Sequence, residues 1–94
     1  MSEWRKRVEE FRDLNKEVSD KALETMKGEL TLDQALRLQQ LLEKHAANAA
    51  QLLQSLEEAD EEPTLIAAAK ALDAIAVQLV SLGAQVLMAK RDAE

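Results

Sequence analysis

The sequence predicts an all-α fold, an antiparallel three-helix bundle formed by a single domain of residues 1–94. Strong helix formers dominate the composition, and the chain contains only two glycines and one proline. Apolar residues recur at helical spacing in three segments of similar length, near residues 3–27, 32–59 and 63–91. Because the connections between these segments are short, consecutive helices are expected to run antiparallel.

The first predicted helix carries one narrow apolar stripe. It ends before Gly28, which follows Lys27 and suits the glycine position just past a helix terminus. Most positions outside the stripe are charged, so one face is expected to be buried and the other solvated. Asn15 falls inside the stripe and is the first residue to break the pattern. The stripe comprises Trp4, Val8, Phe11, Leu14, Val18, Ala22 and Met26.

The second predicted helix begins at a capping box. The Thr31 hydroxyl can accept a hydrogen bond from the third amide of the helix, and Gln34 can reach back to the Thr31 amide. A heptad register follows, of the kind found in coiled coils, in which His45 is the only polar residue. The register comprises Ala35, Leu38, Leu42, His45, Ala49, Leu52, Leu56 and Ala59.

The third predicted helix is apolar around most of its circumference. Pro63 suits its first turn, and between Thr64 and Ala89 the only charged residues are Lys70 and Asp73. A helix of this kind expects neighbours on most sides, which two other helices of one chain do not supply. Its primary stripe is predicted to be Leu65, Ala68, Leu72, Ile75, Leu79, Leu82 and Val86.

This surplus of apolar surface predicts a structural, self-assembling homo-oligomer, a dimer above all, in which the protomers join into a larger helical bundle. Two alternatives stay open. The third helix could be the epitope of a module that binds another protein, or its alanines could simply tolerate exposure in a monomer. The predicted oligomer interface consists of Leu65, Ala69, Leu72, Ala76, Leu79, Val80, Gly83 and Leu87.

Asn15 and His45 are predicted to form a buried polar layer. Antiparallel pairing across the turn near residues 28–31 places them at the same height in the bundle. An unpaired buried polar group costs about 1–3 kcal/mol, and an amide and an imidazole can satisfy each other. Such a layer can fix helix register and oligomer state. In an oligomer His45 could instead meet its own symmetry mate, or lie at an accessible edge.

A small-molecule or heme site at His45 is the alternative function. Heme needs an axial imidazole and a cavity, which small residues such as Ala46 and Ala49 could provide. Zinc needs three or four ligands, and Glu43 projects away from His45. We therefore predict no cofactor and no metal site, with His45 as the one candidate for binding a cofactor.

Composition argues against several other classes. The net charge of −6 and the two aromatic residues do not fit nucleic-acid binding. The chain has no cysteine, no serine at helical spacing from His45 and no glycine-rich phosphate loop, so we expect no enzyme. The longest uncharged run, Ala74–Ala89, is short for a bilayer span, so we expect no membrane partner. The lack of cysteine is compatible with a reducing cytosol.

The pattern resembles computationally designed, de novo α-helical bundle oligomers, and no natural family signature is recognised. Matched helix lengths, a capped loop, a proline-started helix and the regular "EEPTLIAAAKALDAIAVQLVSLGAQVLMAK" segment carry the resemblance. It covers the whole chain. Asn15, Ser19 and Thr25, near the inner face of the first helix, depart from it. The resemblance implies a structural scaffold rather than an evolved activity.

Overall fold

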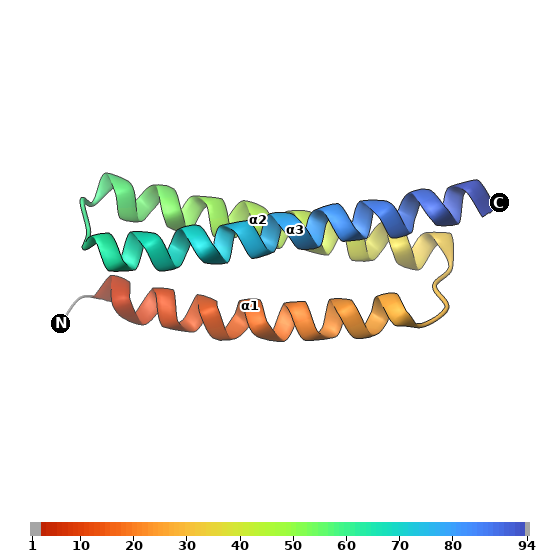
Figure 1. The fold of residues 1–94 in the computed structure, drawn as a ribbon, viewed down its shortest axis with the longest axis horizontal. Helices are drawn as coiled ribbons and strands as arrows, with labels where there is room; N and C mark the ends of the chain where they lie inside the picture. Colours follow the sequence, from red (N-terminus) through yellow and green to blue (C-terminus); the bar gives the residue numbers. More distant parts are fainter. Residues whose placement is uncertain (1–2, 94) are drawn as a thin grey trace.

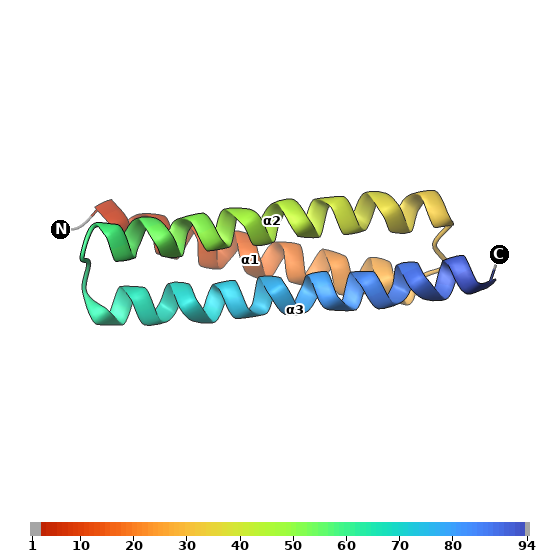
Figure 2. The same cartoon turned by 90° about the horizontal axis from the view of Figure 1, so that it is seen from above.

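The computed structural model describes residues 3–93, and within this range the chain forms three α-helices and an all-α bundle. They are α1 (Glu3–Lys27), α2 (Leu32–Glu58) and α3 (Pro63–Ala93), which agree closely with the predicted segments. Figure 1 shows α2 returning antiparallel to α1, and α3 returning antiparallel to α2. Figure 2 shows α1 behind the pair formed by α2 and α3. The three helices therefore pack as an elongated antiparallel bundle.

The predicted capping box forms at the start of α2. The backbone N–H of Gln34 donates to the Thr31 hydroxyl at 3.1 Å, and the backbone N–H of Thr31 donates to the Gln34 side-chain oxygen at 3.0 Å. Two backbone donors at the helix terminus thus gain partners, which fixes where α2 begins. The prediction of this helix start from the sequence is confirmed.

The left-handed residue in the turns is not the one expected. Neither Gly28 nor Gly83 has a positive φ, and the Gly28 amide donates to the Thr25 carbonyl at 3.2 Å. Asp60 instead takes the left-handed conformation, with φ of 52°. The amides of Asp60 and Glu61 bond back to the carbonyls of Glu57 and Leu56, at 3.1 Å each. This is a Schellman motif, which satisfies the last carbonyls of α2 with an aspartate where glycine is usual.

The interface between α2 and α3 is the most extensive in the bundle. Along α3 the buried positions alternate between leucine and a small residue, which lets the two backbones approach closely. Leu42 and Leu56 of α2 are fully buried against them. The predicted stripe on α3 is therefore rotated toward its small residues, and Ile75 and Leu82 lie outside the core. The buried face of α3 comprises Leu65, Ala69, Leu72, Ala76, Leu79 and Gly83.

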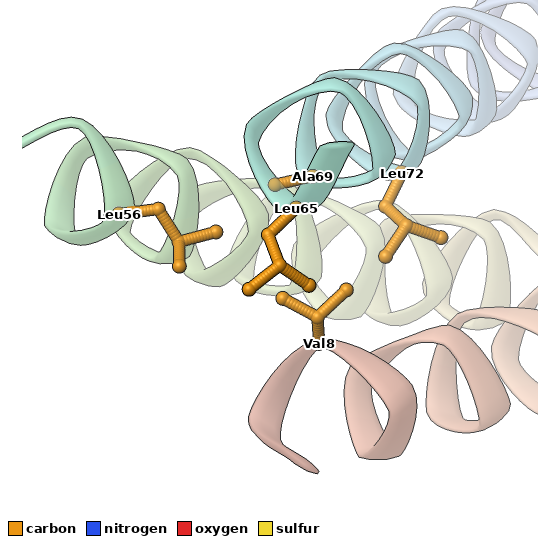
Figure 3. Packing of buried hydrophobic residues seen from close by; sticks show 5 residues of the cluster. All are labelled: Val8, Leu56, Leu65, Ala69 and Leu72. Atoms are coloured by element: carbon orange, nitrogen blue, oxygen red, sulfur yellow. The ribbon is translucent and has the colours of Figure 1, made fainter. Parts of the chain in front are cut away.

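α1 closes the bundle through two apolar clusters. In Figure 3, Val8 of α1 points at Leu65 and Leu72 of α3. Ala22 packs near the other end of α1, against Leu42 and Leu79. Each cluster buries apolar surface that α2 and α3 would otherwise expose. Such burial stabilises a fold by about 25 cal/mol for each Å² removed from water.

One member of the predicted stripe on α1 is misplaced. Leu14 is 46% exposed. Asn15 takes the central inward position, and Leu14, one residue earlier on the helix, points about 100° away from it. Leu14 instead lines hollows between α1 and α2, whose backbones lie farther apart than those of α2 and α3.

Candidate functional site

The two polar residues singled out in the sequence are brought together in the core. Asn15 of α1 is 3% exposed and His45 of α2 is 6% exposed. The His45 Nε2 lies 2.7 Å from the Asn15 Oδ1. An amide oxygen only accepts hydrogen bonds, so the neutral imidazole donates from Nε2–H. The bond joins α1 to α2 at mid-height, between the two apolar clusters.

Phe11 completes this layer. Its ring stacks on the imidazole of His45 with centroids 5.0 Å apart and an angle of 4° between the planes. Phe11 lies one helical turn before Asn15, so α1 presents a stacking ring and a hydrogen-bond acceptor to the same side chain. The sequence placed Phe11 in the apolar stripe but did not assign it to His45. The spacing of four residues between Phe11 and Asn15 is the signal that could have shown it.

The layer holds His45 as a neutral imidazole. Burial lowers the pKa of His45 below its usual value of 6.5, because the charged form loses hydration. No ion pair among the described residues joins His45 to a carboxylate that would offset this cost. The layer is thus a fixed hydrogen bond and ring stack rather than a charged site.

The surroundings of His45 do not favour a heme or metal site. Three hollows of about 390, 320 and 310 Å³ lie along the seams of α1 with α2 and α3, and His45 lines none of them. An iron bound at Nε2 would displace Asn15. Among residues 3–93, no group of three acidic or histidine side chains is placed to hold a metal ion.

A second buried polar contact, which the sequence did not reveal, ties α2 to α3. The Gln39 side-chain amide donates to the Val80 carbonyl at 3.2 Å. Its Oε1 is buried without a hydrogen-bond partner and faces Gly83. A Cβ at Gly83 would collide with this oxygen, so the glycine makes room for the glutamine. The signal in the sequence was Gln39 one residue after Leu38 of the heptad, opposite the one glycine within α3.

The predicted oligomer interface requires a correction. Six of its eight residues form the buried face of α3 and pack against α1 and α2 of the same chain, while Val80 and Leu87 are half-buried. A second chain cannot reach the six buried residues without opening the protomer. Ala69, Ala76 and Gly83 are small and let α2 of the same chain approach closely, so this face is occupied within the protomer. The six are Leu65, Ala69, Leu72, Ala76, Leu79 and Gly83.

Four large apolar side chains of α3 remain exposed. Ile75 and Val77 are 41% and 54% exposed, and Leu82 and Met88 are 36% and 61% exposed. By length and composition alone, α3 is the one helix of the described chain that could cross a membrane, a test that core helices of water-soluble bundles also pass. Two neighbouring helices therefore do not cover the apolar surface of α3.

Comparison of the chain with protein-family models, with curated proteins and with solved structures finds no match.

Proposed function

We propose that this chain is a structural α-helical protein that self-associates through the outer face of α3. The observation that carries the proposal is the uncharged, exposed surface of α3 over residues 74–89. Exposed apolar patches that exceed what a monomer normally shows mark association surfaces. The outer face of α3 comprises Ala74, Ile75, Val77, Gln78, Ser81, Leu82, Gln85 and Met88.

The arrangement of this face suits another helix. At about 100° per residue, Ala74, Gln78 and Ser81 lie along its middle, opposite the buried stripe. Ile75 and Leu82 line one edge, while Val77 and Met88 line the other. The short side chains of Ala74 and Ser81 allow close approach of a second backbone, and Gln78 between them can hydrogen-bond across the contact. The larger apolar side chains can pack on either side.

A second copy of the chain is the partner that this face fits best. The chain carries a net charge of −6, yet the outer face of α3 has no charged residue, so two copies can meet there without repulsion between like charges. A two-fold interface requires a surface that is complementary to itself, which small and apolar residues with the two amides of Gln78 and Gln85 provide. The face is about 24 Å long, at about 1.5 Å per residue.

The resemblance to designed helical bundles supports the same proposal. It implies a scaffold with a set geometry, which agrees with a closed polar layer at His45 rather than an open site. A heteromeric partner on the outer face is the competing proposal, because the same apolar residues could bind another amphipathic helix.

Light scattering tests the proposal. We expect a molar mass near twice the protomer mass of 10.5 kDa at micromolar concentration. Gln78→Glu places a negative charge from each protomer in the middle of the uncharged face and is expected to shift the protein toward the monomer. Gln51→Glu, which adds the same charge at an exposed position of α2, is the matched control and should leave the mass unchanged. A monomeric parent protein, or equal masses for the two variants, would refute self-association through α3.

A further inference from the structure

α1 is attached to the rest of the bundle at three heights. Within the described chain its fully inward residues are Val8, Asn15 and Ala22, which are spaced seven residues apart. Val8 and Ala22 each belong to an apolar cluster with residues of α2 and α3. Asn15, between them, contributes a single hydrogen bond, to His45. Of these three inward contacts, the middle one is thus the one whose strength depends on a titratable group. An exposed ion pair between Arg5 and Glu62, at 3.4 Å, adds a polar contact near the start of α1.

The fully buried apolar part of this attachment is small. Val8 and Ala22 are short side chains, and α1 packs on α2 much less than α3 does. Trp4, Phe11, Val18 and Met26 add half-buried contacts. The outward face of α1 is charged and suits water. α1 therefore covers the apolar faces of α2 and α3 as a strap that could separate while these two helices stay paired.

The charged groups around His45 leave its protonation unassisted. On α1, Arg12 and Lys16 are exposed and pair with Asp13 at 3.9 Å and Asp20 at 3.7 Å. No carboxylate of α1 accepts a hydrogen bond from the imidazole, which instead bonds the neutral side chain of Asn15.

The other two helices add no counter-charge. Glu43 and Lys44 of α2 are exposed neighbours of His45, and in α3 the charged residues nearest its level are Lys70 and Asp73. None of these four forms an ion pair or a hydrogen bond with the imidazole in the described structure. A proton on His45 would therefore place a positive charge between apolar clusters without a carboxylate to balance it.

We propose that His45 is a pH-sensitive latch, in which proton uptake by the imidazole releases α1 from α2 and α3. In the closed state the neutral ring is held between the Phe11 ring and the Asn15 amide. In the released state the imidazolium is hydrated, and residues of α3 such as Leu65 and Leu72 lose the cover that Val8 provides. This release does not depend on the self-association proposed above.

The direction of the pH dependence follows from burial. The closed state holds its imidazole at a pKa below 6.5, while the released state titrates near 6.5. As the pH falls below 6.5 the released state binds a proton that the closed state does not, so the equilibrium moves toward release. Over the interval between the two pKa values, the ratio of released to closed protein rises up to about tenfold for each pH unit.

Trp4 reports the release directly. It is the only tryptophan, lies on α1 and packs against the cluster of Val8 and Leu65. We expect its emission to shift to longer wavelength as the pH is lowered from 7.5 to 5, while far-ultraviolet circular dichroism shows that α2 and α3 stay helical. His45→Gln keeps an amide that can bond Asn15 but does not titrate, so its emission should stay constant over this interval.

Two results would overturn the latch. One is the same emission change in the parent protein and in His45→Gln, which would assign the transition to carboxylates. The other is a parent protein whose Trp4 emission does not change. If His45→Gln fails to fold, amide hydrogen exchange of the parent protein decides the question. Exchange in α1, corrected for its intrinsic pH dependence, should accelerate with the midpoint at which the His45 ring titrates by NMR, and different midpoints would refute the latch. Light scattering of the same samples tests self-association separately.

Discussion

Replacing Gly83 by alanine should destabilise the protein, although alanine is the better helix former. Gly83 lies in the middle of α3 with an ordinary helical conformation, so the helix itself does not require glycine there. Space requires it. An added Cβ would collide with Gln39 Oε1 and lie 3.0 Å from Leu42 Cδ1. Leu42 is fully buried and has little room to move.

The magnitude follows from three contributions. Overpacking a close-packed core costs about 1–3 kcal/mol. Moving the Gln39 side chain away breaks its bond to the Val80 carbonyl, which costs about 1 kcal/mol. The gain in helix propensity from glycine to alanine offsets about 1 kcal/mol of this loss. We expect the free energy of unfolding to fall by about 1–3 kcal/mol.

Urea denaturation followed by circular dichroism measures the loss, and a double-mutant cycle identifies its origin. Gln39→Ala removes the oxygen that the new methyl group meets, so Gly83→Ala should cost less in that background, with a coupling energy of about 1 kcal/mol or more. Ser81→Ala, at an exposed position of the same helix, is the control for propensity alone. If Gly83→Ala raises the stability by about 1 kcal/mol, or if the two substitutions are additive, the steric reasoning is refuted.

Five further substitutions test other parts of the bundle. Asp60→Gly should raise the free energy of unfolding by about 0.5–1 kcal/mol by relieving the left-handed conformation, and Gly28→Ala should not destabilise, both measured by urea denaturation. Asn15→Ala and His45→Ala should each cost about 1–3 kcal/mol but be strongly non-additive together, whereas additive losses would exclude the observed bond. Leu79→Glu buries a charge inside the protomer and should lower the free energy of unfolding by about 4 kcal/mol, with loss of helical content. If Leu79 lay between two chains instead, the variant would be a folded monomer.

Much of the fold is predictable because it depends on local chemistry. The capping box at Thr31 and the proline at position 63 set two helix starts through backbone hydrogen bonding and fixed φ. The common height of Asn15 and His45 follows from helix rise and a short turn, because antiparallel pairing leaves one register. These features involve residues within a few turns of each other or a simple count along two helices.

The features that the sequence did not reveal depend on contacts between helices. Close approach to α2 decided which side of α3 is buried. It favours the small Ala76 over Ile75, a larger member of the predicted stripe. Gln39 can be buried because Gly83, 44 positions away in the sequence, faces it and leaves room for its side chain. Asp60 takes a conformation usual for glycine because the Schellman hydrogen bonds hold it. None of these follows from the periodicity of one helix.

The two buried polar contacts of α2 fix the register of its neighbouring helices, which the apolar residues alone do not. Leucine and small residues alternate along α3 with a heptad repeat, so sliding α3 by seven residues would keep a similar apolar pattern against α2. It would separate Gln39 from the Val80 carbonyl and from the space at Gly83. A similar shift of α1 would separate Asn15 from His45. Each polar group left unpaired in the core costs about 1–3 kcal/mol, so α2 fixes the height of one neighbour through Gln39 and of the other through His45.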